Sequence, residues 1–232
     1  MTFFRTSAGF ALLASLSLSA HAVECASLND CMMRGSSAAT LAETVQFYDR
    51  GIGFWQKSDG DNLLGRAQLM RAQTRIQLYV QGRDPAVLDA AEKDALEAVR
   101  LTPENYLAHA AMGIVRANRG DKAGAAEWMA KVVAADAGNP LAWFERGNYL
   151  LAIGDNAGAV ADFDKAISLL SMRLYDPATK LYALKAGVDL PPPQRIRLYV
   201  QRAQAHNRLN NQKAFDADMA QACALGEKRA CR

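Results

Sequence analysis

Apolar residues recur every three or four positions along most of this 232-residue chain, with polar residues between them. Between residues 39 and 56, the recurring apolar positions are Leu41, Val45, Tyr48, Ile52 and Trp55. This spacing gathers apolar side chains on one face of a helix. Applied along the chain, it predicts helices over 39–56, 62–80, 85–100, 106–119, 122–135, 140–153, 156–170, 194–209 and 212–225.

The middle of the chain repeats itself at an offset of 34 residues. The identical pairs are Leu107/Leu141, Ala108/Ala142, Gly113/Gly147, Gly120/Gly154, Asp121/Asp155, Ala123/Ala157, Gly124/Gly158, Ala125/Ala159 and Lys131/Lys165. Each block is predicted to form a helix, a Gly-Asp turn and a second helix. One such hairpin cannot bury its apolar face alone, so neighbouring hairpins must stack. The sequence therefore predicts an all-α solenoid of stacked antiparallel hairpins, with about nine to eleven helices.

The pattern weakens at both ends of the repeated region. Residues 23–38 are predicted to be an irregular lead-in that a cysteine loop ties down. Beyond Met172 the period slips, and a short helix is predicted near residues 178–186 before a stiff spacer at Pro191-Pro192-Pro193. The expected organisation is a repeat domain over 39–232, with clear repeats at 106–139 and 140–173 and degenerate ones at 40–105 and 194–231.

The first 22 residues have the three parts of a secretory signal peptide. Arg5 precedes an apolar stretch over 10–20, and Ala20-His21-Ala22 offers a small-x-small cleavage site. The stretch has about half of the roughly 20 residues that span a bilayer, so a permanent anchor is the weaker interpretation. We expect cleavage after Ala22 and a periplasmic or secreted protein.

The charge balance gives no argument for nucleic acid or an anionic membrane as partner. The chain has 27 basic and 24 acidic residues, and removal of Arg5 with the signal would leave 26 against 24. A basic patch that binds phosphates needs a clear excess of lysine and arginine on one face.

All four cysteines lie in the predicted mature chain, at Cys25, Cys31, Cys223 and Cys231. Four cysteines permit three pairings. In a stack of helices about 8 to 10 Å apart, the first two lie far beyond disulfide reach of the last two, so two local bridges are favoured. The alternative is that one pair stays reduced.

The repeated positions resemble the tetratricopeptide repeat. The second clear block supplies Trp143, Gly147, Gly154, Asp155, Ala159, Phe163 and Ala166, with Arg146 where the family has Leu. The first supplies Met112, Gly113, Gly120, Asp121, Ala125, Met129 and Val132, with His109 where a bulky residue belongs. The tail from Met219 through Cys231 is similar to the cysteine-rich Sel-like relatives of this family. That similarity implies a Cys223–Cys231 bridge.

The tetratricopeptide-repeat resemblance implies a concave groove lined by the first helix of each hairpin. The groove residues that it implies are Leu107, Ile114, Asn118, Phe144, Asn148 and Leu151. In related proteins an asparagine at the position of Asn148 holds the backbone of a peptide. The alternative is that these side chains are buried against neighbouring helices.

We find no pattern that indicates catalysis, a metal or a cofactor. His109 and His206 have no companion ligands at metal spacing, and Gly51-Ile52-Gly53 lacks the rest of a phosphate-binding loop. Trp143, Phe163 and Met129 are expected in the helix-packing core. The sequence therefore predicts a non-enzymatic scaffold of the bacterial cell envelope that binds a peptide or protein partner in its groove. A Sel-like hydrolase or a binder of cell-wall peptides or beta-lactams is the alternative, and self-association is a third interpretation.

Overall fold

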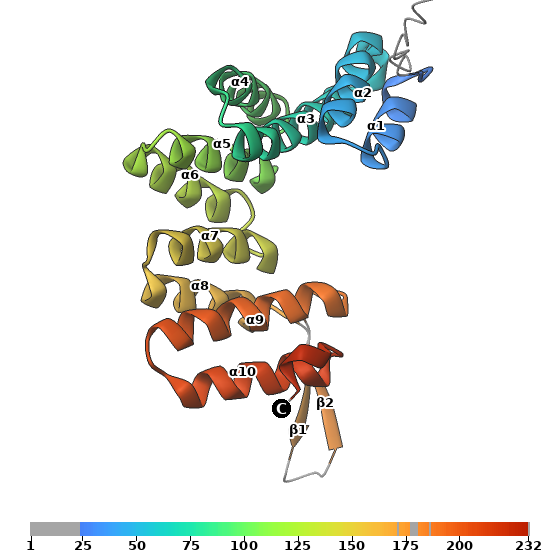
Figure 1. Ribbon diagram of the computed structural model, residues 1–232. Helices are drawn as coiled ribbons and strands as arrows, with labels where there is room; N and C mark the ends of the chain where they lie inside the picture. The colour runs from blue at the N-terminus through green and yellow to red at the C-terminus, as the bar shows by residue number, and fades with distance from the viewer. Residues whose placement is uncertain (1–23, 171, 177–180, 186, 232) are drawn as a thin grey trace, which may run out of the picture.

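Ten α-helices follow one another as five antiparallel hairpins in the computed structural model, which describes residues 24–170, 172–176, 181–185 and 187–231 (Figure 1). The helices are α1 (Leu28–Ser36), α2 (Leu41–Phe54), α3 (Asp61–Gly82), α4 (Pro85–Leu101), α5 (Tyr106–Asn118), α6 (Lys122–Ala135), α7 (Pro140–Ile153), α8 (Asn156–Ser168), α9 (Pro192–Arg208) and α10 (Gln212–Ala224). Short 3-10 turns, η1 (Lys57–Asp59) and η2 (Lys228–Ala230), and an antiparallel pair, β1 (Met172–Asp176) and β2 (Leu181–Lys185), complete the described elements.

The hairpins stack in chain order. Each odd-numbered helix packs on its even-numbered successor, and each even-numbered helix packs on the next odd-numbered one. The odd-numbered helices also touch one another from hairpin to hairpin, whereas no even-numbered pair does so among the described elements. We call α1, α3, α5, α7 and α9 the inner helices and the others the outer helices. The predicted all-α solenoid is confirmed.

The two repeated turns have the backbone that their sequence predicts. Gly120 and Gly154 adopt φ angles of 78° and 89°, in the left-handed region that glycine enters without steric cost. The next residue caps the following helix in each case. The Asp121 side chain accepts a hydrogen bond from the Gly124 amide and that of Asp155 from the Gly158 amide, both at 2.9 Å.

Small residues on inner helices let the two helices of a hairpin approach closely. A Cβ atom on Gly147 would lie 2.7 Å from Cε1 of Phe163, and one on Gly113 would lie 2.7 Å from Cε of Met129. Phe163 is completely buried and Met129 is 3% exposed. The large side chain of the outer helix therefore fills the space that glycine leaves, which confirms that Phe163 and Met129 belong to the core.

Two local predictions are wrong. Residues 28–36 form α1 instead of an irregular lead-in, because Ser27 caps the helix and Leu28, Cys31 and Met32 are buried; Leu28 and Met32 pack in a cluster with Tyr48 of α2 and Ala67 of α3. Residues 181–185 form β2 instead of a helix, because their backbone pairs with β1, with Tyr175 opposite Tyr182. The remainder of the predicted helix at 178–186 lies outside the described residues.

Both disulfides are local. Cys25 pairs with Cys31 and Cys223 with Cys231, with Cα–Cα distances of 5.1 and 5.0 Å. No cysteine is free in the described part of the chain. The first bridge ties the segment before α1, and the second holds the chain after η2 against the end of α10. This confirms the expected pairing.

Three inner helices each carry an arginine that forms a buried ion pair across its hairpin, and in α3 a second arginine, Arg75, bonds the same aspartate. The pairs are Arg71 with Asp94, Arg146 with Asp162 and Arg202 with Asp218. Each arginine of these three pairs donates two or more N–H bonds to its aspartate. The aspartate side chains are only 2–5% exposed. Removal of one partner would leave a buried charge uncompensated, which typically costs several kcal/mol.

The pairs Arg146–Asp162 and Arg202–Asp218 share one register, with the partners 16 residues apart, whereas Arg71 and Asp94 are 23 residues apart. Arg146 directly precedes Gly147, the point of close helix approach, and Asp162 directly precedes Phe163. In the hairpin α5/α6, the residues 34 positions earlier are Met112 and Trp128. Met112 is completely buried and Trp128 stacks on His109. An apolar pair therefore takes the place of the charged pair in one hairpin of the same stack.

Two of the arginines also reach the preceding hairpin. Nη1 of Arg71 donates to Asp49 on α2 at 2.7 Å, and Nη1 of Arg202 donates to Asp164 on α8. Asp49 follows Tyr48 as Asp164 follows Phe163, so the two contacts occupy equivalent positions. Each of these arginines joins the outer helix of one hairpin to both helices of the next.

Removal of Asp162 tests how much stability is lost when Arg146 has no carboxylate partner. The pKa of Arg146 lies above its ordinary value because hydrogen bonding to Asp162 and the charge of Asp162 outweigh burial. We expect Asp162→Ala to lower the free energy of unfolding by about 3 kcal/mol in chemical denaturation. The double variant Arg146→Met/Asp162→Leu, which imitates the apolar pair of α5/α6, should recover most of that loss.

Asp164→Ala is the matched control, because the Asp164 side chain is 56% exposed and its removal should cost less than about 1 kcal/mol. A double variant as unstable as Asp162→Ala would contradict this account of the pair.

Candidate partner-binding surface

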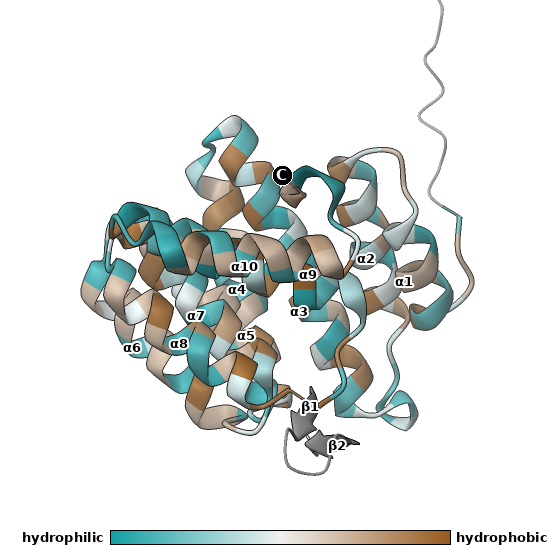
Figure 2. Ribbon diagram, turned by 90° about the horizontal axis from the view of Figure 1, so that it is seen from below, coloured by the Kyte–Doolittle hydropathy of each residue, from teal (hydrophilic) through white to brown (hydrophobic). Residues whose placement is uncertain are grey.

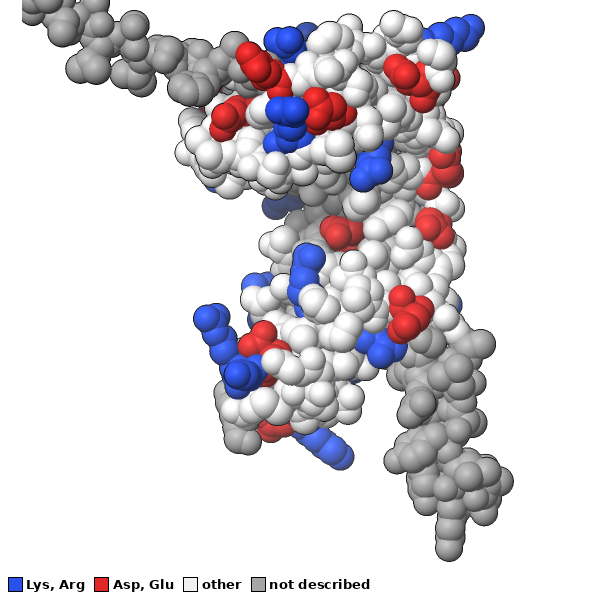
Figure 3. All heavy atoms as spheres, turned by 90° about the vertical axis from the view of Figure 1, so that its right-hand side faces the viewer, with Lys and Arg blue, Asp and Glu red and all other residues white. Residues whose placement is uncertain are grey.

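The inner helices form a continuous row on one side of the stack. Helices α3 and α5, α5 and α7, and α7 and α9 are in direct contact. Figure 2 shows α6 and α8 on the left and α1 and α2 on the right, with α5 and α3 between them. Figure 3 views the molecule from the right-hand side of Figure 1, where charges of both signs are scattered between uncharged side chains and the outline narrows between the N-terminal and C-terminal parts.

Four of the six predicted groove residues keep accessible surface. Ile114 on α5 is 37% exposed, and Leu107, Asn118 and Asn148 are partly buried. Leu107 packs at the edge of the cluster formed by α3, α4 and α5. The Asn118 side-chain amide donates to the Ile114 carbonyl of its own helix at 2.8 Å, so one of its two N–H groups is already engaged. The amide of Asn148 is the better candidate for contacts with a partner.

The other two predicted groove residues lie in the core. Phe144 is 3% exposed and Leu151 is 4% exposed, and both join a cluster with Phe163 and with Leu198 of α9. Helix α9 covers them because the last hairpin packs directly on α7 and α8. The prediction that a partner contacts Phe144 and Leu151 is therefore wrong, and the alternative of burial against neighbouring helices holds for these two.

Two arginines of α9 contact α7 beside Phe144 and Leu151. The Arg197 guanidinium lies 5.3 Å from the centroid of the Phe144 ring. Arg208 donates through Nη1 to the Leu151 carbonyl, near the C-terminus of α7, at 2.7 Å. A cation at that end of a helix interacts favourably with the exposed carbonyls. Both of these α9 arginines therefore contact α7.

Glu145 is the side chain of this surface that sequence reasoning missed. It lies on α7 beside Phe144 and makes no hydrogen bond or ion pair with another described side chain. Burial raises its pKa above the ordinary value, and the positive charge of Arg197 opposes this shift. The charge of Glu145 also affects Tyr106 on α5. Burial and the negative charges of Glu145 and Asp136 raise the pKa of Tyr106 to about 12.

The remaining titratable candidates are structural. His109 is 8% exposed, its Nε2 lies 2.7 Å from the Pro103 carbonyl oxygen, and its ring stacks on Trp128. In the described part of the chain, no group of three or more histidine, cysteine or acidic residues is arranged to hold a metal ion. No described helix is both long enough and apolar enough to cross a membrane.

The chain has the fold of tetratricopeptide-repeat proteins. A tetratricopeptide-repeat protein of Thermus thermophilus superimposes with a TM-score of 0.61 at 12% identity, over 87% of this chain and 92% of that one. A MamA structure gives a TM-score of 0.52 at 15% identity, over 90% of this chain and all of that one. A chain of the APC/C hetero-tetramer Cut9-Hcn1 gives 0.59 at 16% identity, but the likeness covers only 34% of its length and 86% of this chain.

No family model and no curated protein matches the sequence. At identities this low, the similar structures establish the fold alone.

The raised pKa of Glu145 predicts how the stability of the fold changes with pH. Because the pKa of Glu145 is higher in the folded than in the unfolded chain, its contribution to stability is full below the unfolded value and is lost as pH rises through the folded value. At pH 7, well above the ordinary value, the raised pKa of Glu145 therefore costs stability. We expect Glu145→Gln to raise the midpoint of thermal unfolding at pH 7 and to lose this advantage as the pH falls below the ordinary value of 4.5.

Glu127→Gln on the exposed side of α6 is the matched control and should change the midpoint at neither pH. A Glu145→Gln variant that is less stable than the parent at pH 7 would show that the carboxylate is balanced by a favourable contact.

Proposed function

We propose that this protein is a non-catalytic scaffold of the bacterial cell envelope that holds a peptide or protein partner against its inner helices α5 and α7. The observation that carries the proposal is the row of inner helices with Ile114 and Asn148 accessible on adjacent members. An apolar side chain next to an amide can bury a partner side chain while it bonds the partner backbone. Stacked hairpins offer such extended surfaces as a consequence of their architecture.

The use of charged residues supports a scaffold rather than an enzyme. The most buried aspartates are each bonded to an arginine that holds two helices together. His109 is packed against Trp128 and a backbone carbonyl. These groups stabilise the packing of the helices. Binding at the surface of α5 and α7 would therefore depend on shape complementarity and on hydrogen bonds to side-chain amides.

An exported location fits the cysteines. Both disulfides close short loops at the ends of the stack, and such bonds persist in oxidising compartments such as the periplasm. The signal peptide expected over residues 1–22, with cleavage after Ala22, lies outside the described residues. N-terminal sequencing of the protein recovered from the periplasm tests both expectations together.

Site-specific photocrosslinking tests the surface. A photoreactive phenylalanine analogue at Ile114, in protein expressed in its native envelope, should give a discrete crosslinked product. The same analogue at Ala130, which is exposed on the outer helix α6, should not. Asn148→Ala in the Ile114 background should reduce the product several-fold while the circular dichroism spectrum and melting midpoint stay unchanged.

Phe144 is unsuitable for this test because its substitution would disrupt the core. Equal products at Ile114 and Ala130, or no product at Ile114, would overturn the proposed surface.

A further inference from the structure

Among the described residues, no further hairpin packs on α10, the last helix of the stack. Each earlier outer helix packs on the next inner helix, as α8 does on α9. Among the described elements, helix α10 packs on α9 and on the single turn η2. Figure 2 looks at the molecule from below and shows α10 in front.

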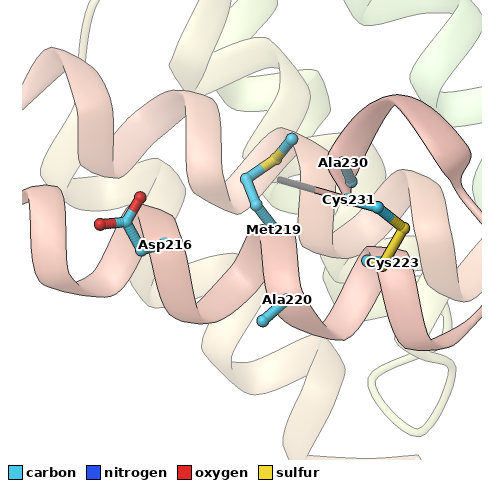
Figure 4. A pocket seen from close by; sticks show the side chains of 6 residues that line it. All are labelled: Asp216, Met219, Ala220, Cys223, Ala230 and Cys231. Atoms are coloured by element: carbon cyan, nitrogen blue, oxygen red, sulfur yellow. A yellow bond between two sulfur atoms is a disulfide. The ribbon is translucent and has the colours of Figure 1, made fainter.

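A pocket of about 320 Å³ lies on this open face. Its lining residues are Asp216, Met219, Ala220, Cys223, Ala230 and Cys231 (Figure 4). Met219 lies between Asp216 and the Cys223–Cys231 disulfide in this view. The disulfide holds η2 over the C-terminal part of α10 only, so the surface around Asp216 and Ala220 remains exposed.

The pocket residues of α10 occupy helix-packing positions of the repeat. The offset of 56 residues that relates Arg146 to Arg202 also relates Phe163 to Met219 and Asp164 to Ala220. In α8 these positions face the next hairpin: Phe163 shares a cluster with Leu198 of α9, and Asp164 bonds Arg202. Helix α10 therefore offers the surface on which the stack has placed a helix at every earlier step.

We infer that a second copy of this chain docks on this face, α10 against α10, across a two-fold axis that runs perpendicular to α10 near Met219. Two helices related in this way are antiparallel, as consecutive helices of the stack are. The small Ala220 permits close approach of the two helices, and the flexible Met219 of each copy fills the pocket of the other.

The charges at the two ends of the face are self-complementary. Asp216 is exposed at one end, and Lys228 and Arg229 are exposed on η2 at the other end. A two-fold axis brings unlike ends together, so each Asp216 faces the basic turn of the other copy. One helix and one turn form a smaller interface than the roughly 800 Å² per partner of a standard complex, so the dimer is weak and concentration-dependent.

Sedimentation equilibrium of the disulfide-intact mature protein between about 1 and 300 µM tests this inference. The average mass should rise from one copy toward two and no further. Ala220→Glu, which places an unpaired charge at the centre of the face, should weaken association at least tenfold. Ala217→Glu is the control, because Ala217 is exposed on the same helix outside the pocket and should leave association unchanged.

Charge exchange distinguishes the two-fold arrangement from others. Asp216→Lys alone and Lys228→Glu/Arg229→Glu alone should each weaken association, because like charges then meet in both contacts of the pair. An equimolar mixture of the two variants should associate better than either variant alone. One contact of each mixed pair is then the parental contact of Asp216 with Lys228 and Arg229, and the other joins the two exchanged sets of charges, which are again opposite.

A protein that stays monomeric throughout would overturn the inference. So would a mass that grows beyond two copies, association that survives Ala220→Glu, or a mixture that associates no better than its components.

Discussion

The buried arginines hold the stack together at two levels. Within a hairpin, Arg146 donates to Asp162, which has almost no contact with solvent, so the inner helix cannot slide along the outer one without stranding a charge. Between hairpins, Arg202 bonds Asp164 of the preceding outer helix as well as Asp218. The same side chain thus fixes the spacing inside one hairpin and the contact with the one before it.

This constraint determines the two surfaces on which function would depend. Because the inner helices are held in a row, Ile114 and Asn148 are presented on adjacent helices instead of on mobile segments. The same stacking leaves α10 uncovered at the C-terminal end. In a dimer formed through α10, two inner surfaces would belong to one particle, and a partner that reached both would gain by effective concentration.

Much of the fold could be predicted from the sequence because its interactions are local and periodic. The 34-residue offset located α5 to α8, and Gly120 and Gly154 marked the turns. Helix α1 was missed because its few apolar residues are buried by contacts with α2 and α3, which no local pattern shows. The pairing of β1 with β2 likewise depends on a partner strand and not on the propensity of residues 181–185.

The candidate surface was only partly predictable for the same reason. The repeat register identified which positions face inward, but burial of Phe144 and Leu151 depends on where α9 lies after a non-repetitive segment. The unusual environment of Glu145 could be recognised only once the structure placed Arg197 and Tyr106 near it. One Arg-Asp pair could be suspected from the sequence, since Arg146 departs from the repeat pattern. Its partner, Asp162, lies 16 residues later and was identified only from the structure.

Amide hydrogen exchange of Arg202→Met, compared with the parent protein, tests most directly whether one arginine joins successive hairpins. Repeat stacks transmit such changes mainly to neighbours. We predict at least about tenfold faster exchange in α8, α9 and α10, with the rates of α3 and α4 unchanged. Acceleration confined to α9, or equal acceleration along the whole chain, would contradict the account.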